Sequence, residues 1–476
     1  MSRSASYDVR FSSGREADAG MSAKARRALV RIIIVSLLIP LSFEFLGFRM
    51  TPSLAVMICL VPLFVQRFFT HAVVWRLPDL LFLLYMFWQA LTIFLNNPER
   101  FVAWTGQQAL LLLGGYFAGR LLVLNRDDFL ALIRFLALAS MVSVPFALYE
   151  ALNDDPIILR IITDFTPFDS FAPNDYDPRM GLYRAQFVFV HPIHYGLMSA
   201  LILVPFFIGL RGHLSTVART IGAGLIGVAC FLSVSSGAVL SVVLQFLIFV
   251  CYRIARLFGS AWKILLISGT LLYTVLELAS TKSAFVAISG RLAFNSGTAY
   301  YRTIIWEYGT QQVMRTPIFG NGYNYWPRPF WMISSSVDNH WLLMAMVHGL
   351  PALIFFSGSI LYAFFAVNRN TGKGDEETDR LRLAWTLSLI GFCMSASTVA
   401  IWGEIQLLFM LLFGAGFWMI GTLPKAPSDA DEAETESEQG RSRLRYTRFA
   451  PVTRGEAAPR PAEAADRAPR YSRRTS

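Results

Sequence analysis

Charged residues are scarce in this sequence. Of its 476 residues, only 16% are Asp, Glu, Lys or Arg, whereas 54% are hydrophobic. Soluble domains carry about a quarter of their residues as charges, so this composition argues against a soluble fold. Runs such as Leu80–Leu95 and Ile221–Leu232 have no charge at all, and about 20 helical residues cross about 30 Å of hydrocarbon. The sequence predicts a membrane protein with many spans.

The sequence also has few cysteines and no nucleotide-binding motif. The four cysteines lie in or beside apolar runs without metal-ligand spacing, so we interpret them as small buried hydrophobic residues. There is no GxxxxGK[ST] loop and no GxGxxG after a strand. We therefore expect neither a cofactor nor a metal, and a synthesis at this protein would need a donor that is already activated.

The bulk of the chain is predicted to be an all-α bundle of about twelve transmembrane helices. Pro351, next to Gly349 and Leu350, removes a backbone donor within the tenth span, which is expected to be a half-helix followed by a second helix. The predicted spans are 32–48, 51–66, 78–95, 103–122, 128–150, 188–210, 217–234, 236–255, 262–279, 340–367, 381–402 and 404–422.

Arginine and lysine indicate the orientation of these spans. Basic residues follow every even-numbered span, which is typical of cytoplasmic loops. The net charge of +10 is thus explained by membrane orientation, and no nucleic-acid partner is expected. The basic tail 1–31 has no signal-peptide cleavage pattern. The Pro-, Glu- and Arg-rich segment 423–476 is predicted to be a disordered cytoplasmic tail, so both termini of the chain are expected to be cytoplasmic.

Two long loops, about 153–188 and 280–339, then fall together on the outer face of transmembrane domain 32–422. The first is rich in aspartate. In the second, a helix is predicted from Ser296 or Thr298, either of which could cap it, through Ile305 until Pro317 stops it. We expect any chemistry of this protein in these two loops.

Histidines give two candidates for the site. His191 and His194 are three residues apart, but Pro192 stands between them and no other metal-binding residue is near in sequence. We therefore interpret them as a loop-to-helix turn with one histidine hydrogen-bonded. His340 follows Asn339 where the second loop enters span ten. It is either a base working near neutral pH or an interfacial residue beside Trp341, and the sequence leaves both open.

Arginines on the outer face are unexpected, because basic residues of membrane proteins prefer the cytoplasmic loops. Their presence there suggests a function. A guanidinium pairs well with phosphate oxygens and stays charged. Arg184 lies just before span six and Arg302 near the start of the loop helix, so both could reach a ligand at the outer leaflet. An ion pair with Asp175 or Asp177 is the alternative for Arg179. For the group, an anionic ligand is favoured, and its members are Arg160, Arg179, Arg184, Arg291, Arg302, Arg315 and Arg328.

Several motifs then resemble those of the O-antigen ligase/polymerase family. They are Arg302-Thr-Ile-Ile-Trp306, Arg315-Thr-Pro317-Ile-Phe-Gly320-Asn-Gly322, Asp338-Asn-His340-Trp-Leu342 with Gly349-Leu-Pro351, and Arg184-Ala-Gln-Phe followed by His191-Pro192 and Gly196. The family often has His-Asn where this chain has Asn339-His340, and Asn-Pro-Asn where it has His191-Pro192-Ile193.

The resemblance implies a metal-independent membrane glycosyltransferase with a GT-C-like bundle in the bacterial inner membrane and a periplasmic active site. Its donor would be an oligosaccharide on undecaprenyl diphosphate and its acceptor a glycan hydroxyl, with other polysaccharide export proteins as further candidate partners. Arg184 and Arg302 would bind the diphosphate and His340 would be the catalytic base. Further candidate substrate-binding residues are Arg291, Trp306, Arg315, His191, His194 and Asn339.

Three functions are compatible with these features. The first is a polymerase of exopolysaccharide or O-antigen repeat units, which the form of the motifs favours. The second is a ligase that passes a finished glycan to lipid A core. A lipid-linked glycan flippase is the third, and it is disfavoured because few charges lie well inside the spans.

Overall fold

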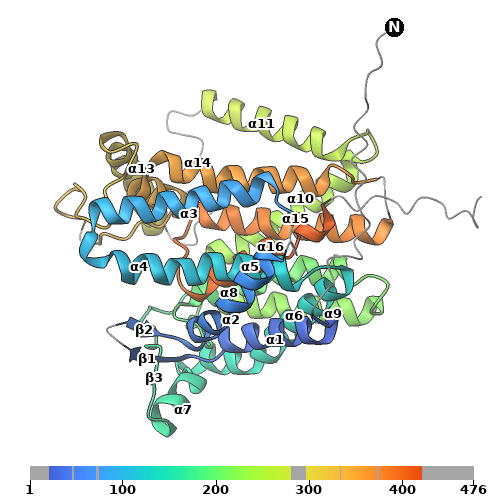
Figure 1. The fold of residues 1–476 in the computed structure, drawn as a ribbon, viewed down its shortest axis with the longest axis horizontal. Helices are drawn as coiled ribbons and strands as arrows, with labels where there is room; N and C mark the ends of the chain where they lie inside the picture. The colour runs from blue at the N-terminus through green and yellow to red at the C-terminus, as the bar shows by residue number, and fades with distance from the viewer. Residues whose placement is uncertain are drawn as a thin grey trace, which may run out of the picture. The chain divides into compact units, whose positions relative to one another are not determined.

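The computed structural model describes residues 21–45, 48–70, 74–279, 296–332, 334–372 and 375–420. The predicted tail 423–476 and the candidate Arg291 lie outside these residues. By contacts the chain forms two units, Met1–Leu423 and Pro424–Ser476, and the elements below all belong to the first. This unit is mostly helical, as predicted (Figure 1).

Seven helices in the described residues are long and apolar enough to cross a membrane. They correspond to seven of the predicted spans, and the chain is therefore a membrane protein. They are α2 (Pro52–Phe69), α3 (Leu77–Asn96), α6 (Arg126–Asn153), α8 with π-helix η4 (Pro192–Gly209), α10 (Ser236–Ala255), α11 (Ala261–Ala279) and α14 (His340–Asn368).

The other five predicted spans are shorter, interrupted or more polar helices, so the count of twelve crossings stays a prediction. These elements are α1 (Ala23–Leu37), α4 (Phe101–Gln108) continuing through π-helix η3 (Ala109–Leu113) into α5 (Gly114–Leu122), α9 (Thr216–Leu232), α15 (Glu376–Ala396) and α16 (Glu404–Gly414), which precedes the 3-10 turn η5 (Phe417–Met419).

The first predicted span, 32–48, is wrong in its second half. Helix α1 ends at Leu37, and the chain continues into strand β1 (Leu41–Phe45). Pro40 explains the change, because proline cannot continue a helix. Strand β1 pairs antiparallel with β2 (Phe48–Met50) on one side and with β3 (Asp169–Ser170) on the other. The all-α prediction therefore lacked a small three-stranded sheet, which ties the first long loop to the start of the bundle.

Both long loops contain helices. The first holds α7 (Ile157–Phe165) before β3, and the second holds α13 (Ser296–Arg315). Helix α13 starts at the predicted Ser296 and ends two residues before Pro317, as expected. Figure 1 shows α13 at the same end of the bundle as the first part of α14.

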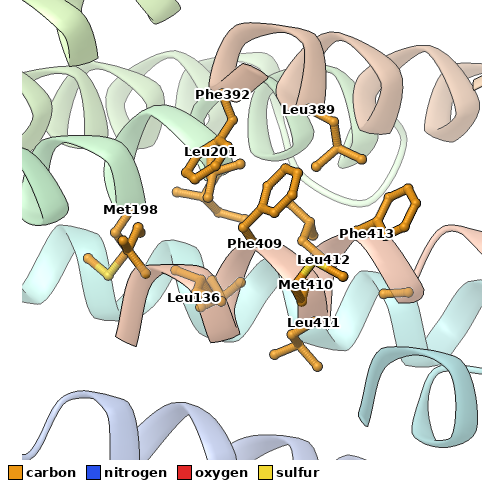
Figure 2. Packing of buried hydrophobic residues seen from close by; sticks show 14 of the residues in the cluster. Leu136, Met198, Leu201, Leu389, Phe392, Phe409, Met410, Leu411, Leu412 and Phe413 are labelled. Atoms are coloured by element: carbon orange, nitrogen blue, oxygen red, sulfur yellow. The ribbon is translucent and has the colours of Figure 1, made fainter. Parts of the chain in front are cut away.

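Helix α16 forms the centre of the bundle. All residues from Glu404 to Gly414 are buried, as expected for a helix that is apolar on all sides. It packs closely on α5 because Gly115 and Gly119, four residues apart, leave room for its backbone. Around it, Phe392 of α15 stacks on Phe409 with ring centroids 4.3 Å apart (Figure 2). This packing fixes the ends of α15 and α16, between which part of the site lies.

Candidate functional site

The first part of α14 folds back on the rest of the helix. Gly349 has φ 80° and ψ 172°, a conformation that essentially only glycine adopts. Trp341 and Phe356 would be about 22 Å apart along a straight helix, yet their ring centroids are 6.0 Å apart. As predicted from Gly349 and Pro351, α14 is therefore two helices. The shorter one, residues 340–348, begins with His340 and is called the half-helix below.

The glycine motif after α13 holds this reversal in place. The amide of Asn321 donates to the carbonyl of Met346 at 2.8 Å, and that of Gly322 to the carbonyl of Val347 at 3.0 Å. The Leu350 amide donates to the Pro317 carbonyl at 2.8 Å. These bonds satisfy backbone groups that the broken helix leaves open. The motif thus has a structural role, because it fixes the half-helix relative to α13.

Glycine is required at two positions of this motif. Gly320 and Gly322 have positive φ angles of 66° and 59°. A Cβ at Gly320 would also collide with the carbonyl of Val347, and one at Gly322 with the side chain of Asn97. The close approach of backbone to backbone therefore explains the Gly-Asn-Gly sequence.

Helix α13 carries Arg302 and Trp306 to the start of the half-helix. The two residues lie one turn apart and line the same small hollow with Asp338 and Asn339. The side chain of Asn339 caps the half-helix, since its Oδ1 accepts from the Leu342 amide at 3.1 Å. Arg302 is buried and donates to the Thr398 carbonyl at 3.2 Å. The predicted Arg302, Trp306 and Asn339 are thus brought together beside His340.

One face of the half-helix borders a cavity of about 270 Å³, the His340 cavity. Three buried polar atoms of its lining residues have no hydrogen-bond partner in the described part of the chain: Nδ1 of His340 and Oε1 of Gln89 and of Gln406. Buried polar atoms are rarely left unsatisfied in native proteins. The three residues line one cavity, which therefore offers polar side chains to a ligand. Tyr85, Tyr323, His348 and Trp402 also line it.

A neighbouring face of the half-helix borders a second cavity of about 290 Å³, the aromatic cavity. Tyr323, Tyr325 and Trp326 line it together with Asn321 and Asn324, and the Arg328 guanidinium lies 5.1 Å from the Tyr325 ring centre. Flat apolar rings beside amides are groups that can stack on sugars and bind their hydroxyls. The two cavities are therefore adjacent, and Tyr323, Leu343 and Val347 line both.

Arg184 is held by the segment that precedes α8. The buried carboxylate of Glu150 accepts from the backbone amides of Gln186 and Phe187 at 2.8 and 3.0 Å. The side chain of Asn174 donates to the Arg184 carbonyl at 3.0 Å. Arg184 itself is 5% exposed. Its Nε donates to the Ser233 carbonyl at 3.5 Å, and its guanidinium lies over the Tyr176 ring at 4.9 Å.

Arg179 joins Arg184 and Arg302 in a cluster of positive charge. Burial and, to a smaller extent, the charge of Arg179 lower the pKa of Arg184 to about 10. Burial also lowers the pKa of Arg302. The charge of Asp338 acts to raise this pKa, and the charge of Arg179 acts to lower it. Within the described residues, neither Arg179 nor Arg184 forms an ion pair, so the alternative pairing of Arg179 with Asp175 or Asp177 is wrong. The cluster has the charge to bind an anion.

His191 and His194 lie next to this arginine cluster. The Nδ1 of His191 accepts from the Ile193 amide at 3.1 Å and so caps α8, while its Nε2 lies 3.0 Å from the Tyr176 hydroxyl. This confirms the predicted loop-to-helix turn. Burial, with the charges of Arg184 and Arg179, lowers the pKa of His191 to about 4. Both histidine rings pack on Trp402, and Trp402 also lines the His340 cavity.

The connection 397–403 links these parts. The predicted span 381–402 is wrong here, because α15 ends at Ala396. The hydroxyls of Ser395 and Thr398 bond backbone carbonyls instead of continuing the helix. Within this connection Thr398 accepts from Arg302, Ile401 borders the His340 cavity, and Trp402 touches the histidine pair.

Other predicted residues lie elsewhere. Arg315, at the far end of α13, is about 20 Å along the helix from Arg302 and is exposed, so the two cannot bind one phosphate. The residues that the sequence analysis missed as site members are Arg179, Trp402 and Gln406. Arg179 carried a signal, since it was one of the outer-loop arginines. Trp402 and Gln406 carried none, because they lay at the boundary of two predicted spans.

No group of three or more His, Cys, Asp or Glu side chains that could hold a metal occurs within the described residues. The groups that the described residues bring to this site are guanidiniums, imidazoles, amides and aromatic rings. Guanidiniums can stabilise a leaving phosphate, and an unprotonated imidazole can accept a proton.

Comparisons with known proteins agree with this arrangement. No curated protein matches the chain. A family model described as O-antigen ligase matches residues 221–357. This stretch includes Arg302, Trp306, the glycine motif and the half-helix with His340. Members of this family are membrane enzymes that process lipid-linked glycans. Over residues 221–357 the chain is therefore similar to the O-antigen ligase family.

Proposed function

We propose that this chain is a membrane glycosyltransferase that moves a glycan from undecaprenyl diphosphate to a sugar hydroxyl on the periplasmic face. Its preferred reaction is the polymerisation of exopolysaccharide or O-antigen repeat units. The observation that carries the proposal is the position of the His340 cavity, three of whose lining residues have an unpartnered buried polar atom, beside the cluster of Arg179, Arg184 and Arg302.

In this proposal the arginine cluster binds the diphosphate. As the bond between the sugar C1 and the diphosphate oxygen breaks, negative charge grows on the leaving group, and fixed guanidiniums stabilise it. They supply the positive charge that a metal ion would otherwise have to provide, so the reaction needs no metal. Arg184 is held in advance by the Glu150–Gln186 contact, so little reorganisation accompanies the reaction.

His340 acts as the general base. The acceptor hydroxyl loses its proton to the unpartnered Nδ1 of His340 while its oxygen forms the new bond to C1. The products are the extended glycan and undecaprenyl diphosphate. The aromatic cavity, next to the His340 cavity, is suited to hold further sugar rings of the acceptor.

The test is turnover by purified protein of undecaprenyl-diphosphate oligosaccharide without nucleotide and with a chelator. A ladder of longer lipid-linked glycans is expected. Product that forms only when lipid A core is added would replace the polymerase by a ligase. No transfer with either acceptor, together with movement of the donor across vesicles, would overturn the enzyme proposal in favour of a flippase.

A further inference from the structure

We infer that the bundle holds a second anion site, at its opposite end, for the headgroup of an anionic phospholipid. The site is a cavity of about 270 Å³ between η4, α9, α10 and the start of α15, the basic cavity. Its charged lining is dominated by five arginines, namely Arg211, Arg219, Arg253, Arg256 and Arg380.

The basic cavity is distinct from the site described above. Helix α10 begins at Ser236, next to the Ser233 carbonyl that Arg184 contacts. Its last turn carries Arg253 into the basic cavity. Twenty helical residues span about 30 Å, which is the thickness of the hydrocarbon layer of a bilayer. The inference therefore does not depend on the proposed transferase activity.

The carboxylates of the basic cavity do not neutralise its arginines. Asp379 is engaged by Arg382 at 2.7 Å and by the Gly372 amide at 2.7 Å. Glu376 pairs with Arg380 at 3.1 Å. In the described part of the chain, Arg211, Arg253 and Arg256 have no carboxylate within ion-pair distance. The cavity thus keeps an excess of positive charge.

Arg219 extends this charge below the surface. It is 9% exposed, and its Nη1 donates to the Phe207 carbonyl at 2.7 Å. Its buried Nε has no hydrogen-bond partner among the described residues. A buried donor without a partner is costly, and an anionic oxygen entering the cavity would satisfy it.

The apolar surroundings favour a lipid over a free anion. Phe207, Phe249 and Leu383 form part of the wall. On the face of α10 that borders the cavity, Phe246 is 37% exposed and packs on Phe207, with ring centroids 6.5 Å apart. Basic pockets between membrane helices typically bind anionic lipid headgroups, and these apolar side chains offer a surface for the acyl chains of such a lipid.

The probe is phosphatidylglycerol, titrated into delipidated full-length protein and followed by native mass spectrometry. Arg253→Gln/Arg256→Gln is compared with Arg100→Gln/Arg160→Gln, which removes the same charge from exposed arginines elsewhere. We expect at least tenfold weaker binding in the first variant and less than a twofold change in the control. Equal affinities in all three proteins would overturn the site.

Two further binding measurements identify the class of ligand. Phosphatidylcholine should bind at least tenfold more weakly than phosphatidylglycerol, and inorganic phosphate should not displace the lipid. Displacement by millimolar phosphate would show a free-anion site and overturn the lipid assignment. If the double variant unfolds, the single Arg211→Gln exchange at an exposed position replaces it, and an unchanged affinity would again count against the site.

Discussion

At Arg184, burial and the neighbouring charge of Arg179 both disfavour the protonated side chain. Burial together with Arg179 lowers its pKa to about 10, which still leaves it charged near pH 7. A bound diphosphate would reverse this penalty, because an opposite charge favours the ionised form.

Arg184→Ala should therefore reduce kcat/KM for the lipid-linked donor by about 100-fold or more, the usual loss for one charge-stabilising donor. Arg184→Lys should restore only part of the rate, since an ammonium lacks the forked geometry of a guanidinium. Initial rates with purified protein measure both. Arg160→Ala in the same loop, where Arg160 pairs with Asp155 at 2.7 Å, should stay within twofold of the unaltered protein, and an equal loss there would contradict the assignment.

His191 is a capping residue that must remain unprotonated at Nδ1. Burial and then the charges of Arg184 and Arg179 lower its pKa from 6.5 to about 4. Between these two values the unfolded chain binds more protons than the folded chain. The contribution of His191 to stability is therefore complete above about pH 6.5 and is lost as the pH falls towards 4.

His191→Asn should weaken this pH dependence, because asparagine keeps a capping oxygen but does not titrate. The melting temperature in detergent, measured at pH 7 and pH 4.5, should drop less for the variant than for the unaltered protein. An identical drop in the two proteins would show that His191 does not titrate in this range.

Tyr325 tests whether the aromatic cavity binds acceptor sugars. It is 72% exposed and lines that cavity, so its removal should not unfold the protein. Tyr325→Ala should raise the KM for the acceptor about fivefold, the loss of about 1 kcal/mol of ring contact, and leave kcat nearly unchanged. Phe330→Ala is the control, because Phe330 is 99% exposed in the same loop and outside the cavity lining. Equal KM values for the two variants would argue against this use of the cavity.

Among the elements, the half-helix 340–348 determines where His340 lies. Its position depends on the reversal at Gly349 and on the backbone bonds from the glycine motif. A straight α14 would carry His340 away from Tyr85 and Gln406, with which it now shares a cavity. The broken helix is thus a requirement of the site.

Gly349→Ala should abolish most activity and destabilise the fold by about 3 kcal/mol. The positive φ strains any side chain, and a Cβ would collide with the Ile318 carbonyl. Gly358→Ala in the second part of α14 is the matched control, since a Cβ there meets only Leu81 at an ordinary 3.6 Å. Thermal unfolding and turnover should change little in the control. Comparable melting temperatures for the two variants would contradict the role given to the reversal.

The sequence was informative where one signal dominated an element. The end of α13 was predicted from Pro317, because proline cannot continue a helix. The break in α14 was predicted from Gly349 and Pro351, since glycine readily adopts a positive φ. The strands of the small sheet were missed, because Phe43 and its neighbours continue an apolar run and part of the pairing of β1 is with Asp169 and Ser170, far away in sequence. The end of α15 at Ala396 was missed as well, since hydrogen bonds of Ser395 to Gly237 and of Thr398 decide it.

Within the site, residue types were easier to predict than partners. Arg184, Arg302 and His340 stood out because charge and imidazole are unusual at the outer face of a membrane protein. Arg179 joins their cluster only because of the folded path of the first loop. Contacts of Glu150, Asn174 and Gln186, which lie apart in sequence, fix this path. Trp402 and Gln406 likewise become site residues only because α15 and α16 separate at 397–403.

At the scale of the whole molecule, the fold separates two regions of positive charge by about the length of α10. One lies beside the His340 cavity, and the other lines the basic cavity at the opposite end. Seven helices of the described residues provide the membrane-spanning frame between them. This arrangement suits an enzyme that handles a lipid diphosphate at one membrane face and is anchored by anionic lipid at the other.

The central claim is that His340 and the arginine cluster transfer a glycan from a lipid diphosphate. The most direct measurement is glycan transfer from purified undecaprenyl-diphosphate oligosaccharide by the unaltered protein and by His340→Ala, with correct membrane insertion verified for both. The account predicts transfer without nucleotide or metal and a loss of about 100-fold or more in the variant, as for removal of a general base. Equal transfer by the two proteins would contradict it.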